Sequence, residues 1–130
     1  MALKKFNLKN AQESKRIFID KASDYEVIDF KAIGHIEELG FSSKNDYYIP
    51  EDLVLLKNLK SLGVNDHCHL PSNIDQLKSL EELYLSNEAI YNVPDSIKNT
   101  TSITDLKIVF DPKDKEPQVA PDWIFDVKNI

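Results

Sequence analysis

This chain of 130 residues has one cysteine, three glycines and one tryptophan. A single cysteine excludes an intrachain disulfide, and three scattered glycines leave no glycine-rich loop that could cradle a phosphate. No segment approaches 18 apolar residues, and no basic stretch followed by an apolar run opens the chain. These absences predict a protein without a membrane span, and we expect it to be cytoplasmic.

Basic charge is scarce beyond the first residues. Residues 1–21 hold six basic and two acidic residues, whereas the other 109 hold ten basic and twenty acidic ones, and the formal net charge is −6. An acidic body disfavours nucleic-acid backbones and anionic lipid surfaces, which attract the opposite sign. It favours a protein partner with a basic patch, although acidic surfaces also serve solubility alone. Fifteen of the sixteen basic residues are lysine, which favours an AT-rich, bacterial source.

The residues that could carry chemistry are few. His67, Cys68 and His69 are adjacent, so they cannot all point at one zinc ion, which needs three or four converging ligands. A catalytic thiolate also needs a directed base and an oxyanion site, and the sequence offers Cys68 neither. We therefore expect no metal, no cofactor and no enzymatic activity. We expect residues 67–69 to form a turn whose polar side chains satisfy its backbone.

What the chain does contain is an internal repeat. Four stretches overlay at offsets of 21 to 27 residues, and they begin at Pro50, Pro71, Pro94 and Pro121. Counted from each proline, positions +3, +6, +9, +12 and +14 are apolar with one exception, Thr100. In order they are Leu53, Leu56, Leu59, Leu62 and Val64; Ile74, Leu77, Leu80, Leu83 and Leu85; Ile97, Thr100, Ile103, Leu106 and Ile108; and Ile124, Val127 and Ile130. A fixed period of this size predicts stacked units that bury a shared core.

The apolar spacing changes within each unit. From the proline to position +9 it is three, which predicts a short helix or 3₁₀ segment with one buried edge. The proline can open this arc, because its φ is already set and its missing N–H costs nothing there. From +12 to +14 the spacing is two, which predicts a strand with one face inward.

These residues resemble a known family. Leu80-Glu-Glu-Leu83-Tyr-Leu85 and Leu59-Lys-Ser-Leu62-Gly-Val64 are similar to the LxxLxL core of leucine-rich repeats. Leu70-Pro-Ser-Asn-Ile-Asp-Gln-Leu77 resembles the LPxxIxxL arc of the bacterial and intracellular subclass of roughly 23 residues. The resemblance implies an α/β solenoid of four to five units, with a parallel sheet on its concave face and short helical or 3₁₀ arcs on its convex face. The family's Asn or Cys three residues after the last strand leucine is absent, since His67 and Glu88 stand there.

The repeat continues upstream in weaker form. From Val27 the same offsets give Phe30, Ile33, Ile36, Leu39 and Phe41. A further copy would comprise Leu8, Ala11, Ile17 and Ile19, with chance apolar spacing as the alternative. We expect one domain, 1–130, in which 1–26 is an N-terminal cap or degenerate repeat, 27–119 are the repeats and 120–130 is a capping half-repeat.

The candidate binding site follows from the strand register. Positions +11, +13 and +15 flank the inward residues and should form three rows on the concave face. The first row is Arg16, Glu38, Ser61, Glu82 and Asp105; the second is Phe18, Gly40, Gly63, Tyr84 and Lys107; the third is Asp20, Ser42, Asn65, Ser86 and Val109. We predict a trough walled by Tyr84, with small polar groups along it. Its partner-binding residues are Glu38, Gly40, Ser61, Gly63, Asn65, Glu82, Tyr84, Ser86, Asp105 and Lys107. Drift at unconstrained surface positions is the alternative.

The function that these features favour is protein recognition without catalysis. A small acidic module suits a monomeric inhibitor or immunity-type protein that neutralises a basic partner, and it equally suits an adaptor fragment. The alternative is the substrate-recognition domain of a larger enzyme or effector. A toxin-like gene next to this one would favour the inhibitor, and a catalytic domain in the same reading frame would favour the alternative.

Overall fold

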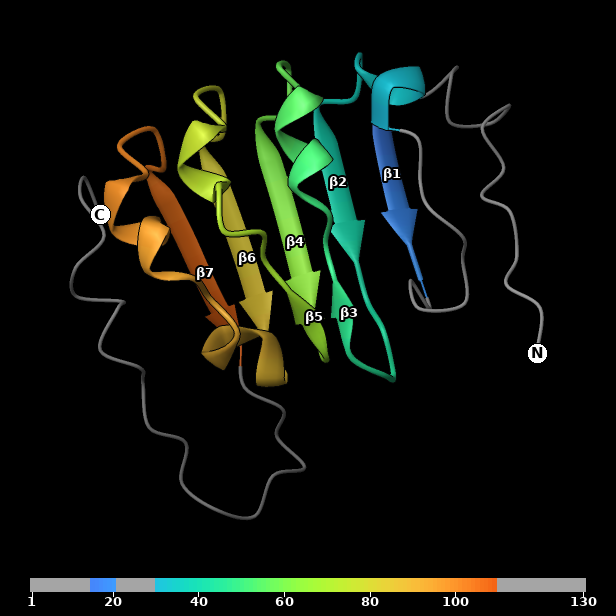
Figure 1. Ribbon diagram of the computed structural model, residues 1–130, viewed down its shortest axis with the longest axis vertical. Helices are drawn as coiled ribbons and strands as arrows, with labels where there is room; N and C mark the ends of the chain where they lie inside the picture. Colours follow the sequence, from blue (N-terminus) through green and yellow to red (C-terminus); the bar gives the residue numbers. More distant parts are fainter. Residues whose placement is uncertain (1–14, 21–29, 110–130) are drawn as a thin grey trace.

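The structure, a computed structural model, describes residues 15–20 and 30–109. Within these residues the main element is a parallel sheet of five strands in the order β1-β2-β4-β6-β7 (Figure 1). The strands are β1 (Arg16–Ile19), β2 (Glu38–Phe41), β4 (Ser61–Asn65), β6 (Glu82–Ser86) and β7 (Asp105–Val109). The fold is therefore of the mixed α/β kind, with strands that follow one another across the sheet.

Short 3₁₀ segments connect the strands, and no long helix occurs in the described part of the chain. They are η2 (Phe30–Ile33), η3 (Glu51–Leu55), η4 (Ile74–Gln76), η5 (Asn87–Tyr91) and η6 (Asp95–Asn99). Pro50 and Pro94 directly precede η3 and η6 as predicted, whereas Pro71 lies three residues before the start of η4. The carbonyl oxygens of Pro50, Pro71 and Pro94 each accept a hydrogen bond from the backbone N–H three residues later, at 3.1 or 3.2 Å. The repeated proline therefore marks the same local geometry each time.

The core lies between the sheet and the 3₁₀ segments. Residues spaced by three lie on one edge of a 3₁₀ segment, which has three residues per turn, and alternate strand residues face the same way. The apolar positions predicted after Pro50 and Pro71 are all buried: Leu53, Leu56, Leu59, Leu62, Val64, Ile74, Leu77, Leu80, Leu83 and Leu85. The polar exception, Thr100, is also buried, and its hydroxyl donates a hydrogen bond to the carbonyl of Ile97. In β7, Leu106 and Ile108 are only half-buried.

The same backbone contact recurs just before each of the last four strands. The carbonyl of Glu37 accepts hydrogen bonds from the N–H groups of Lys60 and Ser61, at 2.7 and 3.0 Å. The carbonyls of Lys15, Lys60 and Glu81 accept equivalent pairs from the residues 21 to 24 positions later. A contact that repeats at this spacing fixes the register of neighbouring strands. The strand expected at Ile17 and Ile19 is confirmed, because β1 pairs with β2 in that register.

Two elements differ from the sequence expectation. Residues 67–69 are not simply a polar turn, because Cys68 and His69 form a short strand, β5 (Cys68–His69), that pairs in parallel with β3 (Tyr47–Tyr48). Cys68 is fully buried in the apolar core. The segment η5 was also not predicted, and its Ala89 and Ile90 are buried. Both elements occupy the stretches between a strand and the next proline, where repeat lengths vary.

The predicted caps lie largely outside the described residues. Of the N-terminal segment 1–26 only residues 15–20 are described, and the half-repeat 120–130 falls wholly outside. In the parts of the chain that the structure describes, no helix is long and apolar enough to cross a membrane.

Candidate functional site

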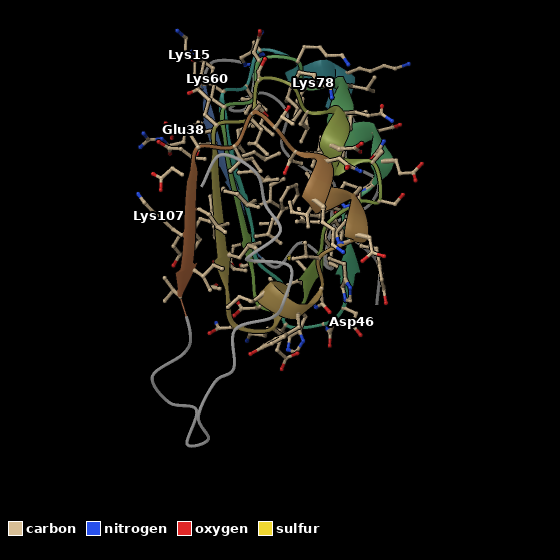
Figure 2. All side chains as sticks on the ribbon, turned by 90° about the vertical axis from the view of Figure 1, so that its left-hand side faces the viewer. Lys15, Glu38, Asp46, Lys60, Lys78 and Lys107 are labelled. Atoms are coloured by element: carbon tan, nitrogen blue, oxygen red, sulfur yellow. The ribbon has the colours of Figure 1, made fainter. Side chains whose placement is uncertain are left out.

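In the part of the chain that the structure describes, the 3₁₀ segments cover one face of the five-stranded sheet and leave the other face open (Figure 1). Figure 2 shows the sheet edge-on, with Glu38 and Lys107 projecting from the open face. The three predicted rows are the paired residues of this sheet. Arg16, Glu38, Ser61, Glu82 and Asp105 are successive partners, and so are Phe18, Gly40, Gly63, Tyr84 and Lys107. In the third row Asn65, Ser86 and Val109 are partners. All ten residues that the sequence suggested for partner binding therefore lie on this face of the sheet.

A shallow depression of about 570 Å³ lies in the middle and third rows. Phe18, Gly40, Gly63 and Tyr84 form its middle, and Asp20, Ser42, Asn65, Ser86, Asp66 and Asn87 line the end toward the strand termini. Phe18 and Tyr84 expose 60% and 36% of their surface. Large exposed aromatic side chains beside a depression are typical of binding surfaces, because they bury much area on contact.

The two glycines of the depression have different surroundings. A Cβ built on Gly40 would lie 2.6 Å from Cδ2 of Phe18, so the Phe18 ring lies over Gly40. A Cβ on Gly63 would have nothing closer than 3.8 Å, with Cδ1 of Tyr84 at 4.0 Å. The absence of a side chain at Gly40 therefore accommodates the Phe18 ring. The absence of a side chain at Gly63 leaves open space between Phe18 and Tyr84.

Internal hydrogen bonds order the third row. The side-chain amide of Asn65 donates to the carbonyl of Phe41 at 2.9 Å, and its oxygen accepts from the hydroxyl of Ser86 at 2.6 Å. The hydroxyl of Ser42 donates to the Asp20 carboxylate at 2.7 Å. Each bond joins neighbouring strands, and the hydroxyl hydrogens of Ser42 and Ser86 are directed at protein oxygens. The row therefore presents mainly acceptors to a ligand.

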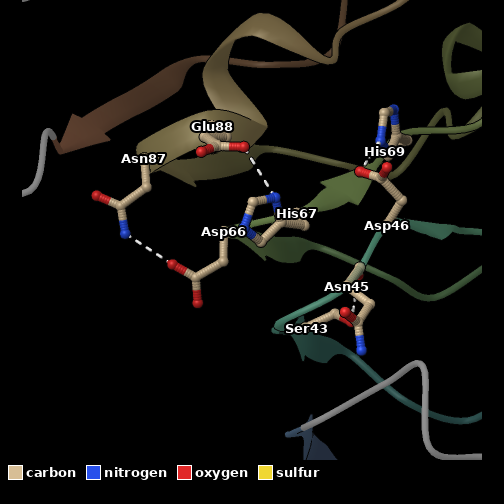
Figure 3. Close-up of polar contacts among 8 residues, drawn as sticks. All are labelled: Ser43, Asn45, Asp46, Asp66, His67, His69, Asn87 and Glu88. Atoms are coloured by element: carbon tan, nitrogen blue, oxygen red, sulfur yellow. Dashed lines mark hydrogen bonds and ion pairs between the residues drawn. The ribbon is translucent and has the colours of Figure 1, made fainter.

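The turns at the strand ends are also held by side chains (Figure 3). Asp66 and Asn87 have φ of 59° and 56°, a left-handed conformation that Asn and Asp tolerate better than most residues. The Asn87 amide donates to the Asp66 carboxylate at 2.7 Å, and Nδ1 of His67 lies 2.8 Å from a carboxylate oxygen of Glu88. These pairs fix Asp66 and Asn87 at the rim of the depression.

The first row is charged, and its carboxylates form ion pairs with the two basic residues of the three rows. Arg16 pairs with Glu38, and Nζ of Lys107 lies 3.8 Å from a carboxylate oxygen of Asp105. None of the described residues that line the depression is basic, whereas Asp20 and Asp66 are acidic. The depression therefore has a negative charge.

The histidines and the cysteine do not converge. His69 lies 3.1 Å from Asp46 and stacks on Tyr48, while His67 faces Glu88. Among residues 15–20 and 30–109, no three His, Cys, Asp or Glu side chains are placed to hold one metal ion. Burial, with a smaller effect from the nearby Asp66, raises the pKa of Cys68 from 9.0 to about 12. A thiol with this pKa stays protonated at neutral pH and is a poor nucleophile.

Sequence reasoning missed part of the depression. Three residues of the predicted rows were not among the predicted binding residues: Phe18, Asp20 and Ser42. Each has the same repeat offset as a predicted binding residue in another unit, and this was the signal that could have included it. Asp66 and Asn87 had no such signal, because their position depends on the left-handed turns. Conversely Glu38, Ser61, Glu82, Asp105 and Lys107 lie on the open face but do not line the depression.

Comparison with known proteins gives no match to a family model, to a curated protein or to a solved structure.

Proposed function

We propose that this protein is a leucine-rich-repeat solenoid that binds another protein, without catalysis, on the open face of its larger sheet. The partner carries a basic patch, and the role is that of an inhibitor or immunity-type protein. The observation that carries the proposal is the depression with Phe18 and Tyr84 on either side of Gly63, on the sheet face opposite the core.

The repeated geometry supports the solenoid. Neighbouring units place the same residues in the same register, and the prolines at 50, 71 and 94 make the same hydrogen bond. Stacked repeats present equivalent positions as one continuous surface, which such proteins use for binding. Aromatic residues near the centre of a protein interface commonly contribute most of its binding energy. The charge of the chain supports the choice of a basic partner, since opposite potentials speed encounter and fix orientation.

We expect two substitutions on the open face to abolish or weaken partner capture. Gly63→Arg fills the space between the aromatic rings and adds a positive charge, and it should not disturb the fold because this position has room. Tyr84→Ala removes an aromatic anchor and should weaken binding roughly tenfold or more. Each purified variant would be used to capture partners from extracts of the source organism, with quantitative mass spectrometry as the readout.

Asn58→Arg is the matched control. Asn58 is exposed in the turn after η3 and lies outside the open face, so the substitution adds the same charge elsewhere. We expect it to capture every partner of the wild type. Circular dichroism would establish that all three variants fold. If folded Gly63→Arg and Tyr84→Ala proteins both retain every partner, the open face is not the docking surface.

A further inference from the structure

The space over Gly63 has the dimensions and surroundings of a slot for one side chain. Gly63 lies in the middle row between Gly40, which the Phe18 ring covers, and Tyr84, whose ring edge is 4.0 Å from the position of a Cβ at Gly63. Neighbouring strands are about 4.8 Å apart, so a group that enters over Gly63 has an aromatic ring on each side. A flat group is the best fit to such a gap.

The polar groups around the slot determine which charge and which hydrogen-bonding atoms a bound side chain should have. The hydroxyl hydrogens of Ser42 and Ser86 and one N–H each of Asn65 and Asn87 are engaged in the protein. A carboxylate has about four lone-pair positions, more than the single hydrogen bond that Asn87 donates to Asp66. The rim thus offers negative charge and acceptors, and it suits a cationic group rich in donors.

We propose that the slot binds the guanidinium group of an arginine side chain of the partner, an inference that rests on the proposed function. The guanidinium is planar, always charged, and carries five N–H donors and no acceptor. Its flat face stacks on the Tyr84 ring, a cation–π contact, and its donors point toward Asp66 and Asp20. A lysine ammonium has no flat face, so it fills the gap less well.

Among the described residues, the two basic side chains of the three rows do not occupy the slot. Lys107 is the row neighbour of Tyr84, but its Nζ lies near Asp105 in the first row, away from the strand ends. Arg16 pairs with Glu38 in that same row. Neither residue lines the depression.

A titration with N-acetyl-arginine amide, followed by the backbone amide signals of the glycines in ¹H–¹⁵N spectra, tests this inference without a known partner. The chain has three glycines, at 34, 40 and 63, so the signals are few. We expect Gly63 and Gly40 to shift in a saturable way, and Gly34, in the turn after η2, to stay unchanged. N-acetyl-citrulline amide has the same shape without the charge, and at equal ionic strength it should bind roughly tenfold more weakly.

Tyr84→Ala should remove most of the shift at Gly63, and N-acetyl-lysine amide should bind more weakly than the arginine compound. Four results would each overturn the inference. The citrulline compound could bind as tightly as the arginine compound, or Gly34 could shift as much as Gly63. The arginine compound could also give no saturable shift, or glucose could give one in its place. If Gly63→Arg blocks partner capture while arginine amide does not bind, the docking face stands and the arginine slot is wrong. If arginine amide binds while both variants retain every partner, the slot binds guanidinium but the proposed function is wrong.

Discussion

Replacing Leu83 by alanine is expected to lower the free energy of unfolding by about 2–5 kcal/mol. Leu83 is the first inward residue of β6, an interior strand of the sheet, and 1% of its surface is exposed. Its partners in register are Leu62 in β4 and Leu106 in β7, so the substitution opens a cavity within the stack of inward side chains. Urea unfolding, monitored by circular dichroism, measures the change.

Glu82→Ala is the matched control for this experiment. Glu82 precedes Leu83 in the same strand and is exposed on the open face. Its replacement should change the free energy of unfolding by less than about 0.5 kcal/mol. Comparable shifts of the two unfolding midpoints would show that the inward and outward faces of the strand have been assigned wrongly.

Alkaline pH is expected to destabilise the protein through two acids, the buried thiol of Cys68 and the half-buried phenol of Tyr47. Burial raises the pKa of Cys68 from 9.0 to about 12, and burial together with Cys68 raises the pKa of Tyr47 from 10.0 to about 12. In the window between the unfolded and folded pKa values, the folded state holds a proton that the unfolded state has lost. The contribution of these two groups to the free energy of unfolding is therefore fully present below pH 9 and decreases as the pH rises from 9 toward 12. For each group the decrease is at most about 1.4 kcal/mol per pH unit.

The Cys68→Ala variant separates the contribution of the thiol to this pH dependence of stability from that of Tyr47. The variant should lose the decrease that begins near pH 9 and keep only the later one, from Tyr47, that begins near pH 10. Urea midpoints measured across this range provide the comparison. Identical pH profiles for the two proteins would show that the Cys68 thiol is not buried as described.

The register of the open face was predictable because the repeat is periodic. Gly40 and Gly63 occupy the same offset in consecutive units, and in a parallel sheet equal offsets become paired positions. The burial of Ile74, Leu77 and Leu80 followed in the same way from a spacing of three. Local spacing and sheet register are linked by simple geometry, and this part of the fold needs no knowledge of side-chain conformation.

The features that escaped prediction depend on tertiary packing. A two-residue strand such as β5 has no periodicity that sequence could reveal, and its pairing with β3 depends on turns whose lengths differ between units. The ring of Phe18 could have turned to either side of β1, and only the folded chain places it over Gly40. Asp66 and Asn87 reach the rim because their backbones are left-handed, which their residue types permit but do not require.

The central claim is that the partner docks on the open face around Tyr84. The most direct measurement places a photo-reactive p-benzoylphenylalanine at position 84, or at position 58 as the control, and irradiates living cells of the source organism. We predict a cross-linked adduct from position 84 with a protein that carries a basic patch, and none from position 58. An adduct from position 58 with none from position 84 would contradict the account and move the interface to the face covered by the 3₁₀ segments.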